Sequence, residues 1–222
     1  MTVNVSGLVW AVKGYPGHRL VQLVVEPHAR RVTYWNALGD GDYNTRWIWT
    51  PDRVWKETPD GSIIASRDTP RTAFEGHNFF TKWDHLHLLY FMGYAIWNYI
   101  CAPFYFSWPG MKLREVENTG QDAVDSSWRA LEVTYPDDIP THNRVQIYYF
   151  DEKHSLRRLD YRAEVVGGTD AGVAAHECFD HQDCNGLLVP TLRRVVSVPD
   201  GQKNGGPSAV LLDFHDVIVK DE

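Results

Sequence analysis

Residues 83–101 read WDHLHLLYFMGYAIWNYIC, a run of apolar and aromatic side chains with few polar interruptions. The run is longer than a typical strand, and Pro103 follows it almost directly. Proline lacks a backbone N–H and cannot continue a helix. We therefore predict one buried helix over residues 83–101.

The stretch 86–106 is also about as long as a membrane span. His87, Gly93, Asn98 and Pro103 interrupt it, and no cluster of Lys and Arg flanks either end. The sequence therefore favours a helix buried in protein, and we expect no membrane span.

Short runs rich in β-branched and aromatic residues lie on both sides of this helix, separated by turn signals such as Asn185-Gly186. Strands with such short connections pair antiparallel. We predict a mainly β (α+β) protein: a single domain, 1–222, with one large curved antiparallel sheet, a half-barrel, and the apolar helix on its concave side. The predicted strands cover residues 18–26, 31–38, 46–50, 53–58, 62–66, 128–135, 143–150, 156–166, 174–183, 187–198 and 209–219.

Composition narrows the classes of function. The chain of 222 residues carries a net charge of −7, so a general affinity for nucleic-acid phosphates is not expected. Three Cys are too few for a disulfide scaffold. The first residues show no basic and apolar export signal, so we expect a cytoplasmic protein. The unusual feature is an aromatic content of 13%, with nine Trp.

The second half of the chain resembles a known family. The segments YYFDEKHSLRRLDYRAEV (148–165) and CNGLLVPTLRRV (184–195), with the apolar helix before them, are similar to the LolA/LppX/LprG-like half-barrels. HLLYFMGYAIW (87–97) and YPDDIPTH (135–142) look like small cytoplasmic bacterial proteins of unassigned activity. The resemblance covers residues 86–196 and implies a curved sheet around an apolar cavity.

Four residues are candidates for acid–base catalysis: His142, Tyr161, His176 and His87. An imidazole titrates near neutral pH, and a phenol in an apolar cavity can donate to a substrate oxygen. Each also has a structural alternative, since His142 could bond to a loop carboxylate and His87 could be a satisfied core residue. Side chains alternate between the two faces of a strand, so Arg158 and Asp160 share one face of the predicted strand and Tyr161 lies on the other. We expect Tyr161 to point inward and the two charged side chains to lie on a solvated outer face.

The wall of the cavity is expected to be aromatic, because nearly all Trp residues fall in the first strands and the helix. Arg144 could hold an anionic group of the ligand. The predicted ligand-binding residues are Trp35, Trp47, Trp49, Tyr90, Tyr94, Trp97 and Arg144.

The most metal-like run is His176-x-Cys178-x-x-His181-x-x-Cys184, which contains four side chains of the zinc-ligand type. On a strand, His176 and Cys178 share a face while His181 points the other way. We therefore expect no metal, although these four residues leave that question open. Nucleotide-binding and hydrolase motifs are absent from the sequence, so no cofactor is expected.

Two functions compete. The first is a cofactor-independent enzyme of the isomerase, cyclase or lyase type, which would act on an apolar small molecule through His and Tyr. The alternative is a non-catalytic carrier or binder of a hydrophobic, lipid-like ligand. A protein-interaction module with exposed Trp is a third possibility. The sequence predicts an apolar small-molecule partner and makes no prediction of oligomeric state.

Overall fold

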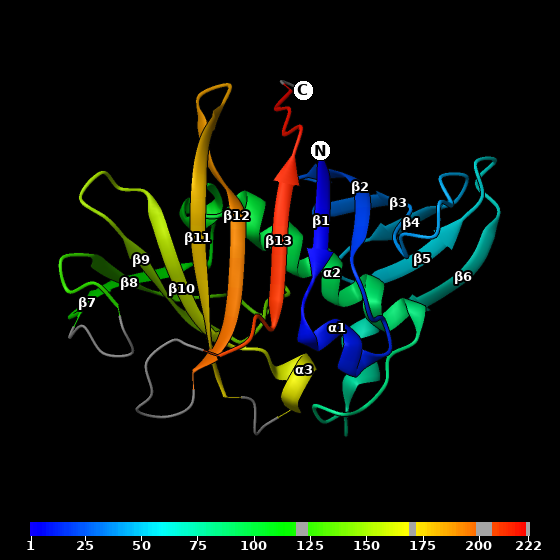
Figure 1. Cartoon of the computed structure of the whole chain (residues 1–222), viewed down its shortest axis with the longest axis horizontal. Helices are drawn as coiled ribbons and strands as arrows, with labels where there is room; N and C mark the ends of the chain where they lie inside the picture. The colour runs from blue at the N-terminus through cyan, green and yellow to red at the C-terminus, as the bar shows by residue number, and fades with distance from the viewer. Residues whose placement is uncertain (119–123, 169–171, 199–205, 221–222) are drawn as a thin grey trace.

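The computed structural model describes residues 1–118, 124–168, 172–198 and 206–220. In this part of the chain, thirteen strands form one sheet in the order β6-β5-β4-β3-β2-β1-β13-β12-β11-β10-β9-β8-β7 (Figure 1). Each neighbouring pair is antiparallel. Strands from both halves of the chain thus join a single sheet, as the runs of β-branched residues predict.

The elements have the following bounds. The strands before the long helix are β1 (Thr2–Ser6), β2 (Arg19–Glu26), β3 (Arg31–Trp35), β4 (Arg46–Trp49), β5 (Arg53–Glu57) and β6 (Ile63–Asp68). Those after it are β7 (Lys112–Val116), β8 (Arg129–Thr134), β9 (Val145–Phe150), β10 (Leu156–Arg162), β11 (Val173–Cys184), β12 (Leu187–Val198) and β13 (Val210–His215). The helices are α1 (Leu8–Lys13), α2 (His85–Cys101) and α3 (Glu164–Gly167), with 3₁₀ helices η1 (Pro70–Phe74) and η2 (Phe104–Ser107).

The predicted helix is α2, and its ends have clear local causes. The Asp84 side chain accepts from the backbone N–H of His87 at 2.8 Å, which caps the first turn. The helix ends at Cys101, because Ala102 precedes Pro103 and a residue before proline avoids the helical conformation. The sequence-based prediction is two residues early at its start, since Trp83 and Asp84 lie outside the helix.

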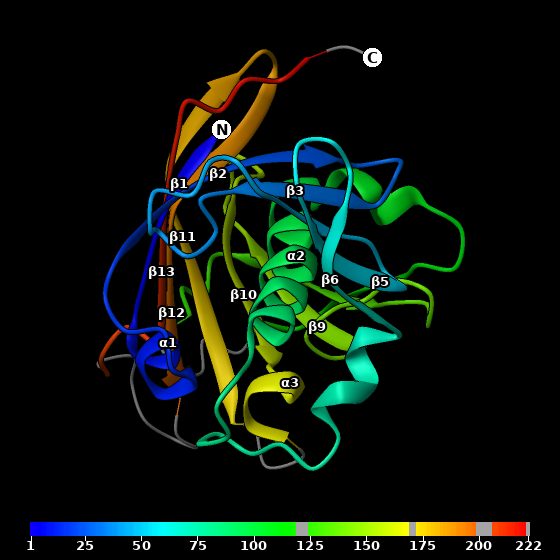
Figure 2. The same ribbon diagram turned by 90° about the vertical axis from the view of Figure 1, so that its right-hand side faces the viewer.

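The sheet curves around α2, which lies on the concave side (Figure 2). This confirms the predicted fold class. Gly93 of α2 lies against the indole of Trp49 on β4, so closely that a Cβ added to this glycine would overlap the indole. The glycine therefore sets the distance between the helix and this part of the sheet.

The strand β1 was missed by the sequence analysis, and it lies in the middle of the sheet. It pairs with β2 on one side and with β13 on the other. Its alternation is only five residues long, with Val3 and Val5 buried and polar residues between them. Its pairing with β13 joins the two ends of the chain.

Two predictions for residues 156–166 are wrong. The strand ends at Arg162, and the chain then turns into α3, which buries Val165 and Val166. Arg158 is not on a solvated face: its side chain is 2% exposed and pairs with Asp160, Nε to Oδ1, at 2.6 Å. A guanidinium can be buried in this way when a carboxylate neighbour binds it in a bidentate manner.

The length and composition of the helices also bear on the predicted absence of a membrane span. Among the residues that the structure describes, no helix is both long enough and apolar enough to cross a membrane.

The contact between Gly93 and Trp49 yields a stability prediction. Gly93→Ala should lower the free energy of unfolding by about 2–3 kcal/mol, because the new methyl group overlaps an indole that is itself fully buried. Gly206→Ala is the control, since no heavy atom of the described residues lies within 4 Å of the position that its Cβ would take. Urea unfolding of both variants measures the difference. A Gly93→Ala protein as stable as the wild type would contradict this packing.

Candidate functional site

A cavity of about 140 Å³ lies between α2 and the middle of the sheet. Its sheet side is mostly aliphatic and comes from β1, β11, β12 and β13. The strand β1 is far from the other three in sequence but pairs with β13 in the sheet. Phe79 and Val166 line it from the loop before α2 and from α3. The principal sheet residues are Val3, Val5, Val195, Val210 and Leu212.

One face of α2 forms the opposite wall. Met92, Ala95, Ile96 and Tyr99 line the cavity, and their spacing of three and four residues places them along one side of the helix. Ala95 is the smallest of the four. A short side chain on the helix opposite valines on the sheet leaves space that larger side chains would fill.

Three ring side chains bring polar atoms to this apolar cavity: Tyr99, His142 and Tyr161. Trp10 also lines it, but its indole N–H already donates to the carbonyl of Ser6 at 3.0 Å. Ser197 lies at an exposed position of the lining. None of the described residues that line the cavity carries a Lys, Arg, Asp or Glu side chain.

His142 is held in place by the loop before β9. Asn98 on α2 donates to the carbonyl of Pro140 at 2.8 Å, and Arg71 donates to the carbonyl of Thr141 at 2.9 Å. These bonds fix the backbone beside His142, whose ring then stacks on Tyr161 with 3.9 Å between centroids. The histidine is therefore fixed between α2 and β10.

A chain of hydrogen bonds runs through the buried side chains behind the cavity. His142 contacts Tyr94 Oη at 3.0 Å through Nδ1 and Tyr99 Oη at 2.6 Å through Nε2. Tyr99 Oη lies 3.1 Å from Tyr161 Oη, which lies 3.4 Å from His176 Nδ1.

The chain ends at Arg193 of β12. Its Nη1 donates to His176 Nε2 at 3.4 Å and to Cys178 Sγ at 3.4 Å, and its Nη2 donates to the carbonyl of Tyr99 at 2.7 Å. The guanidinium also faces the ring of Tyr99. The helix and several strands of the sheet are thus connected through buried polar groups.

Both histidines of this chain are uncharged at neutral pH. Burial lowers the pKa of His142 to about 3, and the positive charge of Arg71 acts in the same direction. Burial, followed by the charge of Arg193, holds the pKa of His176 well below its ordinary value. Burial also raises the pKa of Tyr161 well above its ordinary value, so the phenol keeps its proton.

The structure brings together three of the four acid–base candidates, His142, Tyr161 and His176, and adds Tyr99, which the sequence analysis missed. His87 lies elsewhere, in the first turn of α2, where Nδ1 faces the backbone N–H of Asp84 and Nε2 faces the carbonyl of Ala73. Tyr99 follows Ala95 by four residues and Met92 by seven, so the sequence alone places these three side chains on one face of the predicted helix. A catalytic role for these residues stays a prediction.

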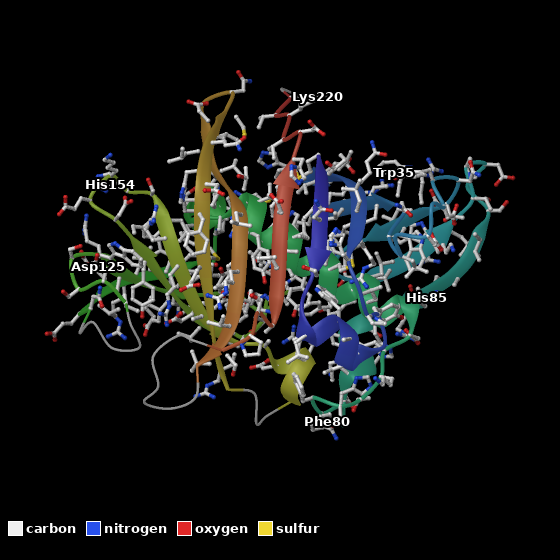
Figure 3. The ribbon with its side chains drawn as sticks, viewed as in Figure 1. Trp35, Phe80, His85, Asp125, His154 and Lys220 are labelled. Atoms are coloured by element: carbon white, nitrogen blue, oxygen red, sulfur yellow. The ribbon has the colours of Figure 1, made fainter. Side chains whose placement is uncertain are left out.

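The predicted aromatic wall lies away from the cavity. Trp49 packs on Trp97 with 6.3 Å between ring centroids, Trp97 packs on Tyr105, and Trp47 packs on His85. These side chains fill the space between α2 and the strands β3 to β5. Figure 3 shows Trp35, the last residue of β3, in the opposite half of the sheet from β11 and β12. None of Trp35, Trp47, Trp49, Tyr90, Tyr94, Trp97 and Arg144 is among the residues that line the cavity.

Two of these residues have other roles. Tyr94 contacts the cavity indirectly, through its bond to His142. Arg144 is exposed and pairs with Asp137 at 2.7 Å, in a separate polar hollow at the surface that Tyr90 also lines. An anionic group held by Arg144 would therefore lie outside the apolar cavity.

The side chains of the metal-like run, His176 to Cys184, do not meet at a common point. Cys178 accepts from Arg193, and His181 bonds to the carbonyl of Leu156 at 2.8 Å. Between them lies Asp180, with a φ of 51°, whose carbonyl accepts from the Thr191 hydroxyl of β12 at 2.7 Å. Among the described residues, no group of three or more His, Cys, Asp or Glu is placed to hold a metal ion.

An open antiparallel sheet that curves around one helix and encloses an apolar cavity defines a class of folds, the half-barrels. Comparison with solved structures identifies the particular fold as LolA-like. A LolA superfamily protein from Nitrosomonas europaea matches with a TM-score of 0.56 and 9% identity, over 100% of this chain and 85% of that one. A DUF1329 family protein from Desulfovibrio piger matches with a TM-score of 0.48 and 11% identity, over 97% and 81%. The first match, at 9% identity, shows a shared fold and nothing finer.

Sequence comparisons add nothing to this assignment. No family model matches the chain, and no curated protein matches it.

The buried histidines make stability depend on pH. As the pH falls below 6.5, His142 takes up a proton in the unfolded chain but not in the folded protein, where its pKa is about 3. Unfolding is therefore favoured at lower pH, and His142 alone should remove about 2 kcal/mol from the free energy of unfolding between pH 7 and pH 5. Urea unfolding at pH 7, 6 and 5 measures the slope.

The variant His142→Gln should lose stability less steeply over this interval. His154→Gln is the control, because this imidazole lies on the exposed turn between β9 and β10 (Figure 3). Equal slopes for His142→Gln and the wild type would show that folding does not lower the pKa of His142.

Proposed function

We propose that this protein binds a small hydrophobic molecule in the cavity between α2 and the central strands. The observation that carries the proposal is an apolar space of about 140 Å³ to which Tyr99, His142 and Tyr161 bring a few uncharged polar atoms. Ligand sites in proteins commonly combine apolar walls with a few fixed polar groups. The LolA-like fold, which encloses such a space on its concave side, supports the same function.

The volume limits the size of the ligand. An engineered protein cavity of about 150 Å³ stays dry and binds benzene. The cavity beside α2 is of similar size, so it holds a compact ring or a short branched chain. A long acyl chain would require the helix and the sheet to move apart.

Binding is better supported than acid–base catalysis. A general base works best when its pKa is close to the working pH, and burial lowers the pKa of His142 to about 3. Such a histidine is a weak base, and it already bonds to two tyrosines. An isomerase, cyclase or lyase activity, without a cofactor, remains a prediction with less support. A cytoplasmic location also remains a prediction.

Filling the cavity tests the proposal. Ala95→Leu places three extra carbon atoms in the space and should weaken the binding of toluene at least about tenfold, without lowering the unfolding temperature. Ala65→Leu, at an exposed position of β6, is the matched control and should bind like the wild type. Isothermal titration with toluene measures the affinities.

Two results would contradict the proposal. One is wild-type protein that binds neither toluene nor other ring molecules of this size up to their solubility. The other is an Ala95→Leu protein with unchanged affinity. Native mass spectrometry of protein purified from its source identifies any retained ligand directly.

A further inference from the structure

The hydrogen-bond chain behind the cavity has one donor proton more than it has contacts in which to use one. Arg193 can only donate, so His176 Nε2 must accept from it, at 3.4 Å. The proton of neutral His176 is then on Nδ1, which donates to Tyr161 Oη at 3.4 Å. The arginine thereby fixes the tautomer of His176 and fills one acceptor position of Tyr161.

The remaining groups of the chain carry four protons, one each on Tyr94, His142, Tyr99 and Tyr161. Only three contacts are left to use them: Tyr94 with His142, His142 with Tyr99, and Tyr99 with Tyr161. One hydroxyl proton therefore has no acceptor among the side chains that form this hydrogen-bond chain. A buried donor without an acceptor destabilises the folded protein.

The surplus proton can reach the cavity. If Tyr94 donates to His142 and His142 donates to Tyr99, the free hydroxyl is that of Tyr161 or of Tyr99, and both of these residues line the cavity. In the opposite direction the free hydroxyl is that of Tyr94, which does not line it. An acceptor atom in the cavity therefore selects the first direction and satisfies the whole chain.

We propose that the ligand carries one uncharged acceptor oxygen, as in a small cyclic ketone, and that it accepts a hydrogen bond from Tyr161 or Tyr99. This inference rests on the proposed function and specifies its ligand. A carboxylate is disfavoured, because no cationic side chain among the described residues lines the cavity. A buried anion without a partner is much less stable than a buried neutral group.

Cyclohexanone and methylenecyclohexane test the proposal, because they have the same shape and differ only in the oxygen. Their affinities are measured in the wild type and in Tyr99→Phe/Tyr161→Phe, and the ratio of the two affinities is compared between the proteins. The hydration of each ligand is the same in both experiments and cancels from this comparison. The ratio of ketone to hydrocarbon should fall about tenfold in the double variant.

Tyr135→Phe is the matched control. Tyr135 is buried and bonds to Tyr105 and Tyr148, in a network separate from the cavity. The ratio should change by less than about twofold in this variant. A second readout does not depend on the variants: the ¹³C NMR signal of the bound ketone carbonyl should lie downfield of its position in cyclohexane.

Each outcome has a distinct meaning. A ratio that is unchanged in the double variant, or a carbonyl signal at its position in cyclohexane, overturns the proposal while the cavity remains a binding site. If the double variant does not fold, the carbonyl signal of the wild type decides. If neither ligand binds to the wild type, the proposed function itself fails.

Discussion

The apolar surface of α2 is the constraint on which the rest of the structure depends. Thirteen of its seventeen residues are buried, and they lie on every side of the helix. A flat sheet covers only one side of a helix, so a helix of this kind needs a sheet that bends around it. The curved sheet satisfies this need, and Gly93 lets the helix approach β4 closely enough for the indole of Trp49 to pack against it.

The two sides of α2 are packed differently, and this difference creates the cavity. Large aromatic rings such as Trp49 and Trp97 fill the side that faces β3 to β5. On the other side, Ala95 faces the valines of β1 and β12, whose side chains are too short to close the gap. The aromatic residues on the first side thus pack the core, while small and branched residues on the other side leave the cavity.

The polar chain from Tyr94 to Arg193 gives the cavity its chemical character. It consists of neutral groups with one permanent cation at its far end, because burial disfavours the charged form of each histidine. The cation does not line the cavity, but it determines the proton position on His176. A residue outside the site thereby limits which hydrogen bonds the site can offer.

The sequence by itself determined the helix, most of the strands and the half-barrel class, because periodicity and turn residues are local signals. It also singled out His142, Tyr161 and His176, which the fold places in one network. Only the tertiary structure decided on which side of α2 the cavity lies, since a helix that is apolar all around has no periodic face to reveal it. The same holds for β1 and for Tyr99, whose roles depend on partners distant in the chain.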